Sequence, residues 1–253
     1  MTSSEQRAAV VTGAASGIGR AVVERLTRDG WSVVGADLEA SAAVEELGAV
    51  AVGADLTTRA GNKAAVDAAL DRFGRLDMIV PNAGFQHVSG VADFDEDRWD
   101  ALLAILLTSP FLLAKYGWEA LRDAPAGGRF VVIASAHALA ASPYKSGYVS
   151  AKHGTLGLVK TLALEGAADG ITATAVCPAY VRTPLAEKQI ADQARTHGIS
   201  EERVMEEVLL APQAVKRLIE PSEVADVVAF LASPAGSAFT GTPVTMDLGW
   251  TAK

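Results

Sequence analysis

Short apolar runs alternate along the chain with amphipathic stretches of helical length. The runs are nearly continuous and rich in β-branched and aliphatic residues, as is typical of parallel strands buried on both faces. They cover residues 8–11, 32–36, 50–53, 76–80, 129–134, 171–176 and 244–246. The stretches between them, such as residues 19–28 and 59–73, have the length of helices in right-handed βαβ crossovers. The pattern predicts an α/β fold with a Rossmann-like, doubly wound parallel sheet and helices on both faces.

One long segment departs from this alternation. Residues 181–220 carry a charged helical pattern after the sixth apolar run, where a sheet of this kind has its carboxyl edge. Segments of that kind at that edge can close over a ligand, so we interpret residues 181–220 as a candidate substrate lid. The chain has neither a linker rich in Pro, Gly and Ser nor an internal repeat, which predicts a single domain over residues 1–253.

Composition and charge narrow the class of protein. Half of the 253 residues are hydrophobic and 21% are charged, as in well-folded globular chains. The net charge of −8 disfavours nucleic acid as a partner, because phosphate binding needs clustered Lys and Arg side chains. Cys177 is the only cysteine, so no internal disulfide can form, which fits a reducing cytoplasm.

The sequence predicts neither a membrane span nor a secretory signal. The closest candidate for a span, residues 101–114, is interrupted by Thr108, Ser109 and Pro110. It falls short of the roughly 18 uninterrupted apolar residues that a span needs, and we interpret it as a buried helix. Residues 1–7 are polar and lack the apolar core of a signal peptide. We therefore expect a cytoplasmic protein without a membrane partner.

A glycine-rich turn follows the first apolar run and opens a helix. It reads Thr12-Gly13-Ala14-Ala15-Ser16-Gly17-Ile18-Gly19, which has the spacing Gly-x3-Gly-x-Gly. Glycines here let the backbone approach a pyrophosphate, whose charge lies at the helix N-terminus. A plain tight turn also uses glycine, but the position on the first strand–helix turn favours a dinucleotide site.

Asp37 ends the second apolar run, about 20 residues beyond the glycine turn. A carboxylate at this place would bind the ribose hydroxyls of NAD, although a helix-capping role is the alternative. The 2′-phosphate of NADP would need a nearby cation, yet Ser16 and Leu38 occupy the positions beside the loop and after the carboxylate. These residues favour NAD as the cofactor.

Two further runs end in residues suited to a ligand site. Asp55-Leu56 follows the third run and Asn82-Ala83-Gly84 follows the fourth. Ligands of open α/β sheets bind at the carboxyl ends of the strands, so we expect both segments to line the cofactor site. Turn formation alone would also explain these residue types.

A tyrosine and a lysine stand one helical turn apart after the fifth run. Tyr148 and Lys152 have the spacing i and i+4, so both side chains emerge on the same face of a helix. A phenol has an ordinary pKa near 10, and a nearby ammonium would favour its ionised form. Ser135, at the end of the fifth run, could hold a substrate oxygen beside this phenol. Tyr-x3-Lys is common on helix surfaces, but its place after Ser135 and the glycine turn favours an acid–base site.

Taken together, these motifs resemble the short-chain dehydrogenase/reductase family over essentially the whole chain. The resemblance depends on Thr12-Gly13-x3-Gly17-x-Gly19, Asp55, Asn82-Ala83-Gly84, Ser135, Tyr148-x3-Lys152 and Pro178-x3-Arg182-Thr183-Pro184. It implies that Ser135 polarises the substrate oxygen, Tyr148 transfers the proton, and Lys152 binds the ribose and lowers the pKa of Tyr148. The expected cofactor-binding set is Thr12, Gly13, Ser16, Gly17, Ile18, Gly19, Asp37, Asp55, Leu56, Asn82, Ala83, Gly84, Tyr148, Lys152, Pro178, Val181 and Thr183. Thr183 would contact the nicotinamide carboxamide, and no metal is expected.

Within the family, the chain is similar to the bacterial D-3-hydroxybutyrate dehydrogenases. The matching pieces include Gly84-Phe85-Gln86-His87-Val88, Ala134-Ser135-Ala136-His137, Lys145-Ser146-Gly147-Tyr148 and Glu187-Lys188-Gln189-Ile190. The resemblance implies that the substrate carboxylate is held by Gln86, His137, Lys145 and Gln189, beside Ser135 and Tyr148. Such a group suits a small hydroxy or keto acid, since an anion needs converging donors and at least one cation. Each residue alone has another explanation: a single Gln or Lys is usually a solvated surface side chain, and His137 could cap a loop.

Several positions depart from the family pattern. Leu106 stands where the family usually has an Asn that helps to hold a water linked to the lysine. The expected effect is a weakened proton relay. Further departures are Pro81, Ala179, Tyr180 and Leu248, and Tyr180 stands at a usual Trp. Two alternatives therefore stay open: a related enzyme for another small hydroxy acid, keto acid or secondary alcohol, and an NAD-binding protein with weakened catalysis. The resemblance also implies a homotetramer, with subunit contacts through residues 101–114 and the segment ending at Trp250.

Overall fold

The structure, a computed structural model, describes residues 6–252 without the side chains of Lys188, Gln189, Thr196 and His197. Within these residues the strands form one parallel sheet of seven. The strand order is β3-β2-β1-β4-β5-β6-β7. The strands are β1 (Ala8–Thr12), β2 (Ser32–Asp37), β3 (Val50–Gly53), β4 (Met78–Val80), β5 (Arg129–Ile133), β6 (Thr172–Pro178) and β7 (Pro243–Met246). Every predicted apolar run forms one of these strands, with ends that differ by at most two residues.

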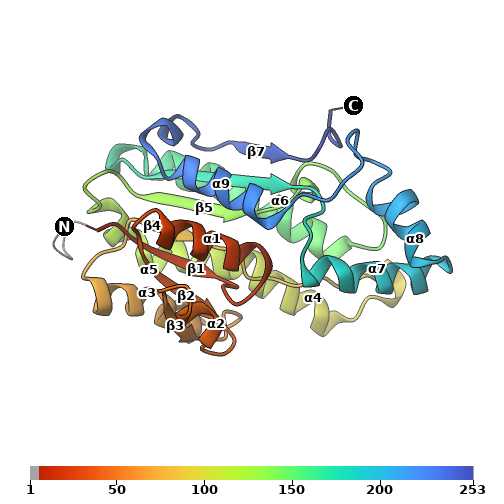
Figure 1. The fold of residues 1–253 in the computed structure, drawn as a ribbon, viewed down its shortest axis with the longest axis horizontal. Coiled ribbons are helices and arrows are strands. Elements are labelled where there is room, and N and C mark those ends of the chain that lie inside the picture. Colours follow the sequence, from red (N-terminus) through yellow and green to blue (C-terminus); the bar gives the residue numbers. More distant parts are fainter. Residues whose placement is uncertain (1–5, 253) are drawn as a thin grey trace.

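Helices connect the strands and cover both faces of the sheet (Figure 1). The α-helices are α1 (Gly17–Arg28), α2 (Ala42–Glu45), α3 (Arg59–Phe73), α4 (Glu96–Leu103), α5 (Ser109–Arg122), α6 (Ser146–Glu165), α7 (Pro184–His197), α8 (Glu201–Arg203) and α9 (Pro221–Leu231). Short 3-10 helices are η1 (Val91–Asp93), η3 (Ala136–Ala138), η4 (Ala167–Asp169) and η6 (Pro234–Ala238), and π-helical segments are η2 (Ala104–Thr108) and η5 (Val204–Leu209).

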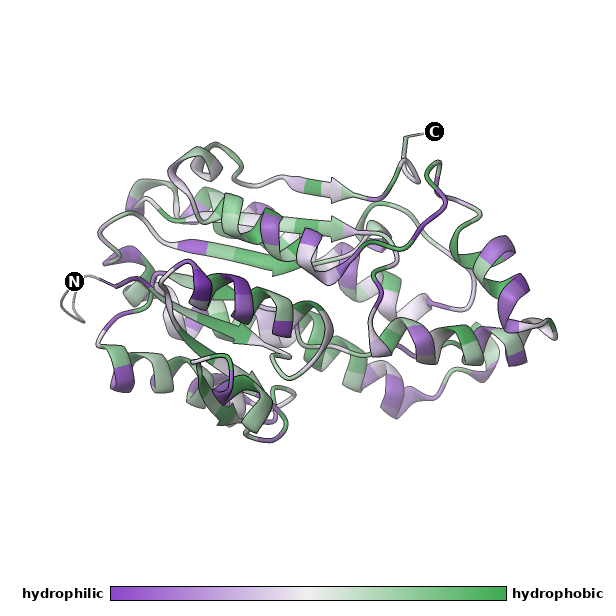
Figure 2. Ribbon diagram, viewed as in Figure 1, coloured by the Kyte–Doolittle hydropathy of each residue, from purple (hydrophilic) through white to green (hydrophobic). Residues whose placement is uncertain are grey.

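The alternation of side chains along each strand divides the core into two layers. Val10 pairs with Val34 on one side and Ile79 on the other, and all three belong to the layer under α3, α5 and α6. The neighbouring Val11 points to the opposite layer, under α1 and α9. Figure 2 shows mostly hydrophobic strands and helices in which hydrophobic and hydrophilic residues alternate. The doubly wound fold predicted from the sequence is confirmed, since burial on both faces requires continuous apolar strands.

The predicted buried helix at residues 101–114 is part of a longer helical segment, Glu96–Arg122. By length and hydropathy this 27-residue segment could cross a membrane, and 44% of its most apolar window is buried inside the protein. Leu113 and Leu121 pack into the sheet core, while Leu102 and Leu106 belong to a separate cluster beside Tyr148. The π-helical segment η2 carries Leu106 and directly precedes α5, which carries Leu113 and Leu121. Its wider turn shifts the phase of the helix, so the two ends pack on different partners.

The segment at residues 181–220 lies beyond the carboxyl ends of the strands (Figure 1). It contains α7, α8 and η5 and packs around a small apolar cluster of its own that includes Val204, Leu209 and Leu218. Its two ends meet in a parallel bridge between Val181 and Ile219. The segment therefore leaves the sheet and returns to it at one place.

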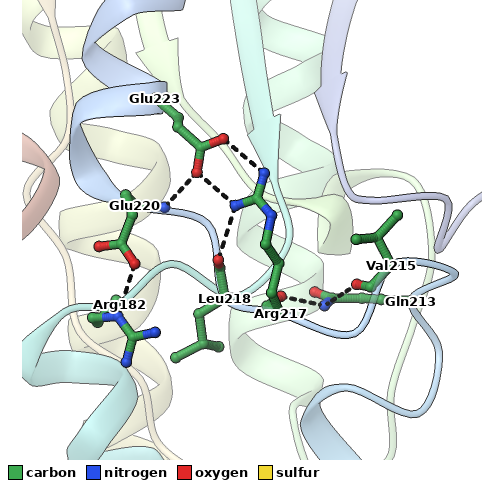
Figure 3. Close-up of polar contacts among 7 residues, drawn as sticks. All are labelled: Arg182, Gln213, Val215, Arg217, Leu218, Glu220 and Glu223. Atoms are coloured by element: carbon green, nitrogen blue, oxygen red, sulfur yellow. Dashed lines mark hydrogen bonds and ion pairs between the residues drawn. The ribbon is translucent and has the colours of Figure 1, made fainter.

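Polar contacts join the two ends of residues 181–220 to each other and to the start of α9 (Figure 3). Arg182 forms an ion pair of 2.9 Å with Glu220 across the two ends. Arg217 binds both oxygens of Glu223 at 2.7 and 2.8 Å and donates to the Leu218 carbonyl at 3.1 Å. Glu223 also accepts from the Glu220 N–H at 2.8 Å, which caps α9. The Glu223 carboxylate thus fixes both the start of α9 and the stretch around Arg217 that leads back to the sheet.

Candidate active site

The glycine turn brings three backbone segments too close together for side chains. Gly13 has a φ of +65°, and a Cβ there would lie 2.9 Å from the Ala83 Cα. A Cβ on Gly19 would lie 2.0 Å from the Gly13 carbonyl oxygen. Helix α1 begins at Gly17, so its free N–H groups and the positive end of its dipole face the adjoining cleft. This cradle suits a pyrophosphate group.

Hydrogen bonds hold the glycine turn to the ends of the neighbouring strands. The Thr12 hydroxyl accepts from the N–H groups of Asn82 and Ala83 at 2.9 and 3.0 Å. The Asn82 side chain in turn donates to the Thr12 carbonyl at 2.9 Å. Thr12 is therefore buried beneath the cleft and does not line its wall, so its role is to position Asn82 and Ala83.

Asp37 lies at the opposite side of the same turn. One of its carboxylate oxygens accepts from the Ala15 N–H at 2.9 Å, and the other accepts from the Leu38 N–H at 2.8 Å. The carboxylate thus braces the glycine turn while it lines the cleft. Asp55 also lines the cleft, but its carboxylate binds the backbone N–H and the hydroxyl of Thr57, which lowers its pKa.

A continuous cleft of about 440 Å³ joins this region to the predicted acid–base residues. Most predicted site residues line it: Gly13, Ser16, Gly17, Ile18, Asp37, Asp55, Leu56, Asn82, Ala83, Gly84, Gln86, Ser135, His137, Lys145, Tyr148, Lys152, Pro178, Val181 and Thr183. Gly19 contributes backbone behind the wall, and the side chain of Gln189 lies outside the described part of the chain. Groups that are far apart in the sequence therefore share one cavity.

Tyr148 and Ser135 meet in the middle of the cleft. Tyr148 lies in the first turn of α6, and Ser135 follows β5 at the carboxyl edge of the sheet. Burial raises the pKa of Tyr148 to about 12, although a hydrogen bond from the Ser135 hydroxyl lowers it. Burial is thus the largest influence on this phenol, and a lowering of its pKa by Lys152 stays a prediction.

Lys152 is buried next to Tyr148 but donates its hydrogen bond elsewhere. Its Nζ lies 2.8 Å from the Ile133 carbonyl oxygen and 5.6 Å from the centre of the Tyr148 ring. Burial lowers the pKa of Lys152 to about 8. The ammonium is thus oriented by the end of β5, with donors left for a ligand in the cleft.

Leu106 occupies the position where an Asn is expected, on the π-helical segment η2. Its side chain fills the space over Gly84, where a Cβ would lie 2.4 Å from the Leu106 Cδ2. Its carbonyl accepts a hydrogen bond of 2.7 Å from the Thr155 hydroxyl. The Leu106 carbonyl is therefore already bonded once within the protein.

Three of the residues predicted to hold a carboxylate line the same cleft, and His137 and Lys145 both lie beside Tyr180. The Gln86 amide nitrogen is buried and has no hydrogen-bond partner among the described residues. His137 is buried, and burial with the nearby Lys145 lowers its pKa to about 3, so its ring is neutral. Burial also lowers the pKa of Lys145 to about 8. Lys145 forms no ion pair with a described carboxylate, so this buried cation has no counter-ion among the described residues.

Aromatic residues that the sequence did not assign to the site form the wall of the cleft beside Lys145. The rings of Tyr180 and Trp250 stack with centroids 5.8 Å apart, and Trp250 lies 5.0 Å edge-on from His137. The Lys145 Nζ donates to the Tyr180 hydroxyl at 2.9 Å. Trp250, expected at a subunit contact, lines the cleft within its own chain. Tyr180 could have been found, since it closely follows the carboxyl end of a strand.

A hydrogen-bonded turn near the C-terminus places Trp250. The Asp247 carboxylate accepts from the N–H groups of Gly249 and Thr251 at 3.0 and 2.7 Å. Leu248 between them has a φ of +54°, and its carbonyl accepts from the N–H groups of Ala214 and Val215. The turn that carries Trp250 is therefore tied directly to the returning end of residues 181–220.

Known proteins resemble this chain along nearly its whole length. A family model described as enoyl-(acyl carrier protein) reductase matches residues 13–251. The D-beta-hydroxybutyrate dehydrogenase of Rhizobium meliloti (strain 1021) is 42% identical, with 98% of this chain and 99% of that protein covered. The enzyme of the same name from Cupriavidus necator is 36% identical, with 98% of each covered. The structure of Thermoplasma acidophilum aldohexose dehydrogenase in ligand-free form matches with a TM-score of 0.89 at 28% identity, over 98% of this chain and 95% of that one.

Proposed function

Because this chain belongs to the short-chain dehydrogenase/reductase family, we propose that it is an NAD-dependent enzyme that interconverts D-3-hydroxybutyrate and acetoacetate. Membership of the family makes it an oxidoreductase with a fold that binds a nicotinamide cofactor. The observation that carries the substrate proposal is the buried Lys145 ammonium. It lies in the same cleft as Tyr148 and Ser135, without an ion-pair partner among the described residues.

The cleft fits the proposed cofactor at several points. The backbone around Gly13 and Gly17 leaves room for phosphates, and Asp37 offers a carboxylate to ribose hydroxyls. Among the residues that line the cleft, the cations are Lys145 and Lys152, both of which lie toward Tyr148. The end near Asp37 therefore repels a 2′-phosphate, which supports NAD over NADP.

The proposed roles of the polar side chains follow from their places. When bound, the oxidised cofactor supplies a hydride acceptor for the carbinol carbon. The Ser135 hydroxyl orients the substrate oxygen and, through its hydrogen bond, favours the ionised form of Tyr148. Tyr148 takes the hydroxyl proton as the carbonyl forms. Lys152 would bind the cofactor ribose with the donors that remain beside its bond to Ile133.

The substrate carboxylate would lie at the opposite end of the cleft. Lys145 supplies the charge, while the Gln86 amide, whose nitrogen has no partner among the described residues, supplies a neutral donor. His137, held neutral by burial, has one N–H, which would turn from its contact with the Ser142 hydroxyl to the carboxylate. We further propose that residues 181–220 close over this acid and that Gln189 contributes a donor from α7. A cytoplasmic homotetramer completes the proposal.

Replacing Tyr148 by phenylalanine tests the chemistry directly. Tyr148→Phe removes one hydroxyl and keeps the ring, so cofactor affinity should stay unchanged. Turnover of D-3-hydroxybutyrate should fall by about 10²- to 10⁴-fold, the usual contribution of a general acid–base group. NADH formation is measured with D-3-hydroxybutyrate, lactate and cyclohexanol, beside NAD binding by fluorescence.

The other substrates and the variant separate the alternatives. Faster oxidation of cyclohexanol than of D-3-hydroxybutyrate would point to a secondary-alcohol dehydrogenase. NAD binding without turnover of any substrate would point to a binding protein with weakened catalysis. Near-normal activity of Tyr148→Phe would refute the assigned proton transfer.

A further inference from the structure

A second cavity adjoins the catalytic cleft on the far side of the aromatic wall. It has a volume of about 740 Å³. Lys145, Tyr180 and Trp250 line both cavities, so these three side chains form a partition between them. The partition is held by the hydrogen bond from Lys145 to Tyr180 and by the stacked rings of Tyr180 and Trp250.

The second cavity contains a buried donor that the proposed reaction does not use. Gln193, on α7, is only 3% exposed. Its amide lies close enough to Tyr180 to lower the pKa of that phenol, which burial raises, but its nitrogen makes no well-formed hydrogen bond to a described residue. Gln193 lines the second cavity and is absent from the lining of the catalytic cleft. A buried amide that lacks an acceptor costs free energy, so a ligand with acceptor oxygens would compensate for it.

The charges around Gln193 favour an anionic ligand. Lys145 makes one hydrogen bond to a described residue, and its other two N–H groups can serve either cavity. Glu207, the acidic residue of the lining, is neutralised by Arg203, which binds both of its oxygens at 2.8 and 3.0 Å. The remaining positive charge on this wall is that of Lys145.

Apart from these groups, the second cavity has a largely apolar lining. The residues that provide it are Ala141, Pro143, Tyr144, Ile199, Val208, Ala211, Pro212 and Trp250. Ser142 is already bonded to the His137 ring at 3.0 Å. A carbon chain that ends in a carboxylate matches such a lining, because methylenes pack on the apolar wall while the carboxylate takes the buried donors.

We infer that the second cavity extends the substrate site, so that the enzyme also oxidises hydroxy acids with more carbons between hydroxyl and carboxylate. This inference rests on the proposed function. The simplest such acid is 5-hydroxyhexanoate, which has the same CH3–CHOH end as 3-hydroxybutyrate and two more methylene groups. Its hydroxyl would lie at Tyr148 and its carboxylate at Gln193 and Lys145, and the hydrogen bond from Lys145 to Tyr180 would open to let the chain pass the partition.

The reaction on the longer acid balances as it does on the shorter one. The carbinol carbon gives up a hydride, which carries two electrons, to an oxidised nicotinamide cofactor. The hydroxyl proton passes to Tyr148, and the C–O bond becomes a carbonyl. The products are 5-oxohexanoate, the reduced cofactor and one proton.

Two variants test this inference against matched substrates. Gln193→Leu should lower kcat/KM for 5-hydroxyhexanoate by about 10- to 100-fold, the effect of losing a hydrogen bond to a charged group. It should leave kcat/KM for 3-hydroxybutyrate unchanged. Ala211→Trp, at an exposed position on the rim, should have the same selective effect by filling the cavity, whereas Ala211→Ser should change neither substrate.

The outcomes distinguish this inference from the proposed function. Turnover of 3-hydroxybutyrate without turnover of 5-hydroxyhexanoate would overturn the inference alone. Equal effects of Gln193→Leu and Ala211→Trp on both acids would overturn it as well, because the cavity would then have no separate role. Failure of the wild-type enzyme with both acids would overturn the proposed function and this inference with it.

Discussion

The buried Lys145 ammonium should lower the free energy of unfolding of the protein, although the same group contributes to substrate binding. Its side chain is 2% exposed, and burial lowers its pKa from 10.5 to about 8. Such a difference means that folding disfavours the charged amine by about 3 kcal/mol. Lys145→Met keeps the length of the side chain and removes the charge. The variant also loses the hydrogen bond to Tyr180, worth about 1 kcal/mol. At pH 7 its free energy of unfolding should therefore rise by about 2 kcal/mol.

The pH dependence gives the sign of this effect. Below pH 8 the amine is protonated in both the folded and the unfolded chain, so the full penalty applies. Between about 8 and 10.5 only the unfolded chain keeps the proton, and the stability of the wild type rises with pH. The advantage of Lys145→Met should consequently be largest below pH 8 and disappear toward pH 10.5. Urea unfolding at pH 7 and pH 10 measures both values.

Substrate binding should change in the opposite direction. Without the ammonium, the KM for D-3-hydroxybutyrate should rise by about 10- to 100-fold, while the KM for NAD stays the same. In the wild type the KM for the acid should also rise above pH 8, where Lys145 loses its proton. Lys145→Arg, whose charge does not titrate in this range, should abolish that pH dependence. A less stable Lys145→Met protein at pH 7, or an unchanged KM for the acid, would refute the reasoning.

Two further variants address the cofactor end and the proton relay. Replacing Asp37 by Ser and Leu38 by Arg should raise kcat/KM for NADP by about 10- to 100-fold and lower it for NAD, since an arginine can pair with the 2′-phosphate. The control Leu38→Gln should leave the ratio of kcat/KM for NADP to that for NAD unchanged. An unchanged ratio in the double variant would contradict the role of Asp37 in selecting NAD. Leu106→Asn should raise turnover by up to about tenfold, part of what acid–base groups contribute. It should also lower the free energy of unfolding by about 1–3 kcal/mol, because an amide replaces a side chain that is 3% exposed. Turnover that is unchanged or lower at every pH would contradict the relay.

Local sequence patterns predicted the fold because each strand is a nearly continuous apolar run. The segment around Val10, for example, is buried on both faces, so every residue in it has to be apolar. The glycine turn was predictable for the same kind of reason, since Gly13 and Gly19 stand where side chains do not fit. Residues 181–220 were recognised by their break in this alternation, and they lie beyond the strands; that they act as a substrate lid stays a prediction.

Features that depend on contacts between distant residues were not predictable. Gln193 looks like an ordinary polar residue of a charged helix, and only its burial beside the second cavity distinguishes it. The stacking of Tyr180 on Trp250 joins residues that are far apart in the sequence. The sequence reveals a lysine near Tyr148 but not that burial raises the pKa of the phenol.

The bridge between Val181 and Ile219 bears on how such enzymes diversify. Both ends of the intervening segment are joined at this bridge and by the pair of Arg182 and Glu220. Insertions and replacements between adjoining ends disturb the rest of a domain little, and the entropy of closing a loop changes slowly with its length. The part of the segment beyond Ala186 can therefore vary between relatives, which would change substrate selectivity while Val181 and Thr183 keep their places in the cleft.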